Sequence, residues 1–264
     1  MTEIINIKNL TKKFNDFIAV DNISFSVEKG KIFAFLGPNG AGKTTTIRIL
    51  TTLLRPTEGS ILVNGKDPLK EKNAVRKSFG IVFQDSSLDD ELTAYENMEF
   101  HGMLYSVPKK IRKARIEYLL KMVGLWNRRD DFVKTFSGGM KRRLEIARGL
   151  IHHPKILFLD EPTLGLDPQT RTSIWKHVKE LNRKEKMTIF FTTHYMAEAE
   201  EVADEIAVID NGKIIKQGNL NQIKKSTRAS SLEQAFLKLT GKTIREENPI
   251  SKDRMRLKRR LWRR

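Results

Sequence analysis

The sequence predicts an α/β fold in which helices cover both faces of a largely parallel β-sheet. Two observations support this prediction. Short apolar runs typical of buried strands recur along the chain, and several are separated by segments whose apolar residues repeat at helical spacing. A block with helical pattern, residues 85–154, interrupts the series of strands. The buried strands are expected at residues 32–36, 79–83, 156–159, 188–191 and 205–209.

Antiparallel pairing is expected at two places outside this parallel series. The first thirty residues contain two strand-like runs, 4–7 and 23–27, and a third follows at 60–63. They predict an antiparallel β subdomain at the N-terminal end. After the run 205–209, Asn211-Gly212 predicts a two-residue turn into a hairpin strand.

The inserted block contains two recognisable helix patterns. Thr93 begins one helix, and residues 109–123 form a basic amphipathic helix that ends at Gly124. Its apolar positions are expected largely on one face, at Ile111, Ile116, Leu119, Leu120 and Val123. Since no internal repeat is found, the chain is divided into a core (1–84 and 155–217), a helical subdomain (85–154), and a C-terminal helix with a basic tail (218–264).

Composition limits the classes of function. The 264 residues include no cysteine, which excludes a disulfide framework and cysteine-based zinc sites. No apolar run approaches the roughly 20 residues that span a bilayer, and the first residues lack the features of a signal peptide. We therefore expect a soluble, cytoplasmic protein with a full hydrophobic core.

The net charge of +17 is spread unevenly. Residues 251–264 hold eight Lys or Arg against one Asp. This tail is interpreted first as a solvated, disordered end. Contact with anionic lipid is a second possibility, because apolar residues alternate with the basic ones. Nucleic-acid contact is the least favoured, and we expect no specific nucleic-acid partner.

A glycine-rich loop follows the first buried strand. The run 37–45 matches the pattern G-x-x-x-x-G-K-[ST], and apolar residues at helical spacing follow it. Glycines let backbone N–H groups turn toward a phosphate, and a helix N-terminus adds positive potential. Lys43 supplies charge for the β- and γ-phosphates, and the Thr44 hydroxyl is placed to bind Mg²⁺. A glycine turn without a ligand fits the full pattern poorly. The chain is therefore predicted to bind a nucleoside triphosphate on a P-loop NTPase sheet, through Gly37, Asn39, Gly40, Ala41, Gly42, Lys43, Thr44 and Thr45.

Two carboxylates end a second buried strand. Asp160 and Glu161 follow the run 156–159, and ligands gather at the carboxyl ends of parallel strands. Asp160 is expected to hold Mg²⁺ through water, since hard cations prefer oxygen ligands. Glu161 is expected to polarise the attacking water. An acidic turn, favoured by Pro162, is the alternative.

A second glycine turn, Ser137-Gly138-Gly139, opens another predicted helix. An ordinary N-cap is the simplest explanation of such a turn. However, this helix ends just before the carboxylate strand, and its N-terminal N–H groups are a second anion site on the same chain. Because the loop 37–45 already holds one set of phosphates, this turn is predicted to serve the nucleotide of another molecule.

Taken together, these residues resemble the ATP-binding subunits of ABC transporters from about residue 4 to 240. The family signature stands as Phe-Ser-Gly-Gly-Met at 136–140, and residues 161–168 resemble the segment that follows the catalytic Glu. Residues 84–93 and 231–241 are similar to exporter ATPases of the daunorubicin-resistance type. The signature departs from the family at Phe136, usually Leu, and Met140, usually Gln; its Ser-Gly-Gly is intact.

The resemblance implies roles for further residues. Gln84 occupies the Q-loop position, which contacts nucleotide and metal. His194 matches the switch histidine and is catalytic together with Glu161, although a lone His after a strand is often structural. Asp167 would reach across a dimer. Phe14 would stack on adenine, with Phe17 as a nearby alternative and a core role as the competing explanation for Phe14.

The resemblance also implies an assembly. Two copies would meet head to tail, each ATP lying between the 37–45 loop of one and the 137–139 turn of the other. Separate membrane-spanning permease subunits would dock near residues 85–125, so the pair would sit on the cytoplasmic face of the membrane. The Mg²⁺ ligands would be Thr44, Gln84 and Asp160.

Two alternative functions are considered: a soluble ABC-type ATPase acting on ribosomes or nucleic acid, and a regulatory binding module with little turnover.

Overall fold

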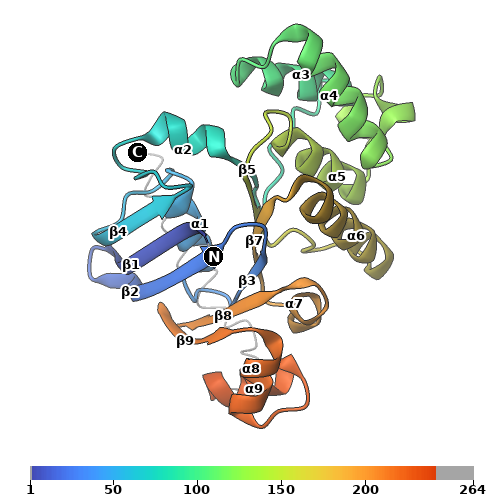
Figure 1. Cartoon of the computed structure of the whole chain (residues 1–264). Helices are drawn as coiled ribbons and strands as arrows, with labels where there is room; N and C mark the ends of the chain where they lie inside the picture. The colour runs from blue at the N-terminus through green and yellow to red at the C-terminus, as the bar shows by residue number, and fades with distance from the viewer. Residues whose placement is uncertain (1, 242–264) are drawn as a thin grey trace.

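The computed structural model describes residues 2–241, and the predicted basic tail at 251–264 lies outside them. The protein is built around two sheets with helices packed about them (Figure 1). The larger sheet has six strands in the order β5-β6-β7-β3-β8-β9. Its strands are β3 (Ile32–Leu36), β5 (Phe79–Val82), β6 (Ile156–Asp160), β7 (Thr188–Thr193), β8 (Glu205–Asp210) and β9 (Lys213–Gly218).

Five of these six strands run parallel, and β9 pairs antiparallel with β8. Every residue of β3, β6 and β7 is buried, as expected for parallel strands covered on both faces. Asn211 and Gly212 both have positive φ, 47° and 77°, as the turn between β8 and β9 requires. The predicted parallel sheet and its C-terminal hairpin are therefore confirmed.

The smaller, antiparallel sheet has the order β2-β1-β4, with β1 (Glu3–Phe14), β2 (Phe17–Glu28) and β4 (Glu58–Val63). The predicted subdomain is confirmed, but β1 and β2 are each 12 residues long and the sequence indicated only their outer parts. The pairing of β1 with β2 shifts register between Ile7 and Leu10. Asn9 and Asn22 have left-handed φ values of 52° and 51° there. These irregularities break the alternation of apolar residues on which strand prediction depends.

Strand β3 separates two hydrophobic clusters. Its residues Ile32, Ala34 and Leu36 face one cluster, whereas Phe33 and Phe35 face the other, because side chains alternate along a strand. The second cluster joins the larger sheet to the antiparallel sheet and to helices α1 and α2; the first contains residues of the other helices. The helices are α1 (Lys43–Leu50), α2 (Lys72–Ser78), α3 (Ala94–Leu104), α4 (Lys109–Met122), α5 (Gly138–Gly149), α6 (Pro168–Glu185), α7 (Met196–Val202), α8 (Leu220–Thr227) and α9 (Leu232–Thr240).

The inserted helical subdomain stands at the top of Figure 1, where α3 and α4 lie above α5. Thr93 caps α3 with a reciprocal bond to Glu96, as its place at the start of the pattern predicts. In α4, Ile116, Leu119 and Leu120 are fully buried, but Ile111 is 50% exposed. The prediction for Ile111 is therefore wrong: this residue lies in the first turn of α4 and points away from the core.

The helix predicted after the 37–45 loop is confirmed as α1, which ends at Leu50. The seven-residue helix α2 has no counterpart in the sequence analysis; it buries only Val75 and Ser78, too little to give a helical pattern. Among residues 2–241, no helix is both long and apolar enough to cross a membrane.

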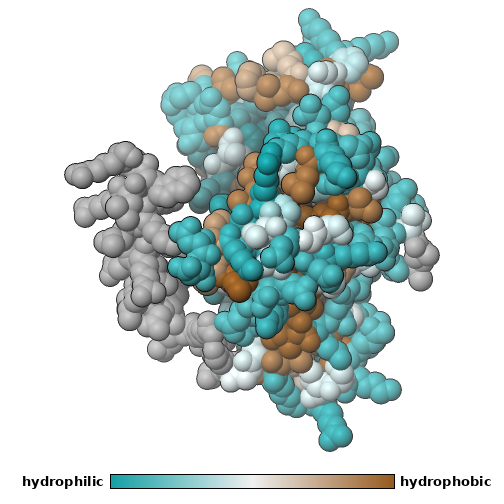
Figure 2. Space-filling view, turned by 90° about the vertical axis from the view of Figure 1, so that its left-hand side faces the viewer, coloured by the Kyte–Doolittle hydropathy of each residue, from teal (hydrophilic) through white to brown (hydrophobic). Residues whose placement is uncertain are grey.

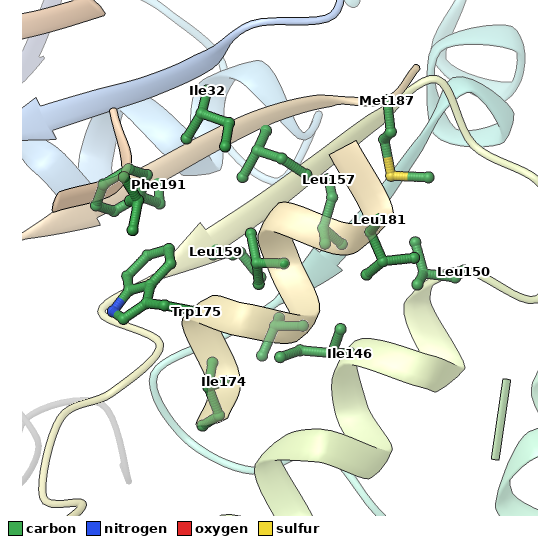
Figure 3. Close-up of a cluster of buried hydrophobic side chains, with 14 of the residues drawn as sticks. Ile32, Ile146, Leu150, Leu157, Leu159, Ile174, Trp175, Leu181, Met187 and Phe191 are labelled. Atoms are coloured by element: carbon green, nitrogen blue, oxygen red, sulfur yellow. The ribbon is translucent and has the colours of Figure 1, made fainter. Parts of the chain in front are cut away.

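Aromatic packing between α6 and β7 anchors the first cluster. Figure 3 shows Trp175 beside Phe191, whose ring centroids lie 4.6 Å apart. We expect Phe191→Ala to lower the free energy of unfolding by about 3–5 kcal/mol, since it removes a fully buried ring and leaves a cavity. Phe100→Ala on α3 is the matched control, because that ring is 56% exposed. Urea denaturation measures both, and equal losses would contradict this description of the core.

Candidate nucleotide site

The loop 37–45, called here the phosphate loop, connects β3 to α1 at the carboxyl edge of the sheet. Two of its glycines cannot be replaced without moving backbone. A Cβ on Gly37 would lie 2.3 Å from the Ile209 carbonyl oxygen, and one on Gly42, whose φ is 107°, would lie 2.6 Å from that of Ala19. The loop thus packs tightly against β8 and β2, while Asn39 and Gly40 at its tip remain exposed. This is a backbone cradle of the kind that binds phosphate.

Lys43 lies at the centre of the site and is only 5% exposed. Its Nζ donates to the carbonyls of Gly37, at 2.7 Å, and Pro38, at 3.2 Å. The same Nζ is 3.1 Å from Glu161 Oε1. The other carboxylate oxygen, Oε2, lies 2.7 Å from Nδ1 of His194. The structure therefore joins three residues that the sequence analysis singled out in separate segments.

The two neighbouring carboxylates are in different electrostatic states. Burial raises the pKa of Asp160, and its hydrogen bonds with Thr192 and Thr44 offset part of that increase. Burial alone would also raise the pKa of Glu161, but the hydrogen bond with His194 and the charge of Lys43 outweigh it and lower the pKa. Glu161 is therefore ionised at neutral pH.

The backbone of Glu161 is held in an uncommon conformation. Its φ is 50°, in the left-handed region that non-glycine residues rarely adopt. Its N–H donates to the hydroxyl of Thr192 at 3.0 Å, and that hydroxyl donates to Asp160 Oδ1 at 2.6 Å. Thr192 thus positions both carboxylates. Sequence analysis missed it, because one Thr in a buried strand gives no functional signal.

The residues predicted to hold a metal ion lie around one groove. The Thr44 hydroxyl donates to Asp160 Oδ1 at 3.3 Å. Thr44, Gln84 and Asp160 all line a groove of about 530 Å³ beside the phosphate loop. Within residues 2–241 no three His, Asp or Glu side chains cluster as an all-protein metal cage would require. A hydroxyl, an amide and one carboxylate instead fit a hard divalent cation that keeps water ligands and binds phosphate oxygens.

The aromatic residues proposed for adenine are both at the surface. Phe14 ends β1 and Phe17 begins β2, and the two pair across the hairpin. Phe14 is 44% exposed, with Lys12 Nζ 4.9 Å from the centre of its ring. A role for Phe14 in the core is therefore excluded. Since β2 also contacts Gly42, this hairpin adjoins the phosphate loop.

Residues 137–139, called here the signature turn, form the N-terminal end of α5. Ser137 caps the helix by accepting from the Met140 N–H at 3.3 Å, so the N-cap explanation is correct for its side chain. Ser137 and Gly138 are exposed. Within residues 2–241, the signature turn and the phosphate loop of one subunit are not hydrogen-bonded to each other.

The segment after Glu161 packs behind the signature turn. A Cβ on Gly139 would lie 2.5 Å from Thr170 Cγ2. Asp167 caps α6, accepting from the Thr170 N–H at 3.0 Å and its hydroxyl at 2.6 Å. The two departures from the family signature, Phe136 and Met140, both pack against the first hydrophobic cluster. They are therefore packing residues, whereas Ser137 and Gly138 of the turn are exposed.

Arg142 is a second residue that the sequence analysis missed. It lies in the run 141–143, which suggests an exposed basic stretch, but it is only 7% exposed. Its guanidinium bonds to main-chain carbonyls of Phe83 and Gln84. Burial of a charged side chain can be recognised only in three dimensions, so no sequence signal could have found it.

The pKa of Glu161 gives a prediction for stability. Because its folded-state pKa lies below the ordinary value of 4.5, its ion pairs stabilise the fold above about pH 4.5, and this contribution is lost as the pH falls below that value. We expect the difference in unfolding free energy between wild type and Glu161→Gln to shrink in that range. Denaturant unfolding from pH 7 to pH 3 tests this, and a difference independent of pH would contradict it.

Comparisons with known proteins agree with this geometry. The family described as ABC transporter matches residues 20–164. The daunorubicin resistance ATP-binding protein DrrA3 of Streptomyces coeruleorubidus is 38% identical over 252 residues, which cover 91% of this chain and 79% of that protein.

Two solved structures are similar as well. The ATP-binding subunit of an ABC transporter superposes with a TM-score of 0.82 at 29% identity, covering 90% of this chain and 99% of that one. A dimer of the ATP-binding cassette MJ0796, in a post-hydrolysis state with ADP and Pi, gives a TM-score of 0.73 at 28% identity, covering 82% and 98%. The family match, the similar proteins and the site together lead to one conclusion: the chain belongs to the ABC transporter family and is an ATPase, similar to drug-resistance ATP-binding proteins.

Proposed function

We propose that two copies of the chain form a head-to-tail dimer with two ATP molecules in its interface. Each ATP lies between the phosphate loop of one subunit and the signature turn of the other. The observation that carries this proposal is that the signature turn is exposed and separate from the phosphate loop of its own subunit. The similarity to MJ0796, which was solved as a dimer, supports dimerisation.

In this dimer, ATP hydrolysis is accelerated by positioning of the reacting groups and by electrostatic stabilisation of the charge on the phosphates. The triphosphate takes the place of Glu161 beside Lys43, so the carboxylate is freed to orient the attacking water. His194, whose Nδ1 lies 2.7 Å from Glu161 Oε2, would contact the γ-phosphate. Mg²⁺, bound by Thr44, Gln84 and Asp160, would neutralise charge on the β- and γ-phosphates.

Two further residues complete the proposed nucleotide site. The exposed ring of Phe14 stacks on adenine, with Phe17 as the alternative from the same hairpin. Asp167 lies on the segment beside the signature turn and reaches the partner subunit, although in the structure its carboxylate caps α6. ATP therefore joins the two subunits, and hydrolysis weakens their interface.

The dimer drives separate membrane-spanning subunits, so its place is the cytoplasmic face of the membrane. We propose docking at residues 85–125 of the helical subdomain (85–154), apart from the core formed by 1–84 and 155–217. Three apolar side chains of α3 are exposed there: Phe100 at 56%, Met103 at 50% and Leu104 at 66%. Figure 2 shows apolar side chains among hydrophilic ones at the top of the molecule, the level of α3 and α4 in Figure 1. The similarity to a daunorubicin resistance protein favours an exporter, including one for drugs.

Affinity purification of the tagged chain from detergent-solubilised cells tests this role. Recovery of membrane-spanning proteins together with ATPase activity is the expected result. Recovery of ribosomes or nucleic acid would favour a soluble ABC-type ATPase instead. A chain that binds ATP without turnover, alone or with its partners, would identify a regulatory binding module.

A further inference from the structure

Arg142 connects the helix of the signature turn to the candidate site of its own subunit. It lies on α5, a few residues beyond Gly139. Its Nη2 donates to the Gln84 carbonyl at 3.2 Å and to the Glu161 carbonyl at 3.5 Å. Its Nη1 donates to the Phe83 carbonyl. One buried guanidinium therefore bonds to the main chain of both a predicted metal ligand and the predicted catalytic carboxylate.

Two more residues of α5 extend this connection. Glu145 is 3% exposed; its Oε2 lies 3.0 Å from Nη1 of Arg142, and its Oε1 accepts from the N–H of Ser87 at 2.9 Å. Arg148 donates to the carbonyl of Ser87 at 2.7 Å and also to its hydroxyl. We call Arg142, Glu145 and Arg148, with the main chain of 83–87 that they bind, the clasp.

The chemistry of the clasp suits positioning more than simple packing. Residues 83–87 belong to no helix or strand, so side chains of α5 supply hydrogen bonds that regular structure would otherwise give. Arginine can bind several carbonyls at once because its planar guanidinium carries five donors. Within residues 2–241, the side chain of Gln84 has no hydrogen bond and lines the groove beside Thr44 and Asp160. The clasp therefore holds the backbone of Gln84 and leaves its amide available.

The same helix carries the signature turn at its N-terminus. A 12-residue helix moves as one body, so any displacement of 83–87 would be passed through the clasp to Ser137–Gly139. We propose that the clasp couples the two ATP sites of the dimer, with Arg142 as its central positioning residue. Occupation of a subunit's own phosphate loop then sets the position of the turn that it offers to its partner. This inference rests on the proposed dimer.

Arg142→Gln in a Glu161→Gln background tests the coupling without hydrolysis. We expect the concentration of MgATP that gives half-maximal dimerisation, measured by light scattering, to rise about tenfold, the lower end of losses seen when a residue behind a metal ligand is removed. Binding of metal-free ADP by the phosphate loop of the monomer should not change. Arg148→Gln, at a partly exposed position, should shift dimerisation in the same direction with less risk to folding.

Arg143→Gln is the matched control, because the next residue on α5 donates to the Val123 carbonyl and not to 83–87. It should alter neither measurement. Unchanged dimerisation of both Arg142→Gln and Arg148→Gln would overturn the inference. An equal loss of metal-free ADP binding would also overturn it, because Arg142 would then only maintain its own site. A Glu161→Gln parent that stays monomeric with MgATP would instead contradict the proposed dimer, and the clasp inference with it.

Discussion

Glu161→Gln should lower the rate of ATP hydrolysis by about 10²–10⁴-fold, the range that a positioned general base contributes, while ATP binding persists. Glutamine keeps the shape of the side chain but cannot accept a proton from the attacking water. It also removes the charge that pairs with Lys43 at 3.1 Å and with His194 at 2.7 Å. Phosphate release at saturating MgATP measures the rate, and equilibrium binding of ATP measures the affinity.

The control for this substitution is Glu117→Gln on the exposed side of α4, where the carboxylate pairs with Lys121. Its rate should equal that of wild type. If Glu161→Gln hydrolyses ATP at an undiminished rate, Glu161 is not the group that activates water, and a binding module with incidental turnover becomes the better description.

Lys43→Met should weaken ATP binding by about 30- to 4000-fold, which corresponds to the roughly 2–5 kcal/mol lost when one member of a buried, hydrogen-bonded charge pair is removed. The ammonium group is nearly inaccessible and lies among the carbonyls of the phosphate loop, so its charge is held at the place where the phosphates are expected. Isothermal titration with ATP measures the affinity.

Lys121→Met is the matched control for Lys43→Met, since it removes an exposed lysine from a surface ion pair and should leave ATP affinity unchanged. The methionine at position 43 should also leave Glu161 bonded to His194 alone. A variant that binds ATP as tightly as wild type would show that the triphosphate does not occupy the phosphate loop.

Most of the fold could be predicted because its signals are local. Strands β3, β6 and β7 are buried throughout and stand in the sequence as unbroken apolar runs. The inner halves of β1 and β2 lack this signal, because the irregular pairing around Asn9 and Asn22 disturbs the alternation. Helix α2 was missed for a related reason, since only two of its residues are buried.

The candidate site could be predicted to a similar extent. Spacing identified the phosphate loop, and position at the end of a strand identified Asp160 and Glu161. The contacts of Lys43 and His194 with Glu161 depend on three segments meeting at one edge of the sheet, which motifs alone do not describe. Arg142 is harder still, because a buried arginine among lysines and arginines looks like part of an exposed helix.

The central claim is that ATP joins two copies of the chain, and size-exclusion chromatography with light scattering on Glu161→Gln tests it most directly. Without nucleotide the protein should have the mass of a monomer, about 30 kDa as its sequence gives. Addition of ATP in the absence of Mg²⁺ should shift it to twice that mass, since neither subunit can then hydrolyse the nucleotide. A mass that stays at the monomer value with ATP would contradict the account, because the signature turn would then capture no nucleotide from a second subunit.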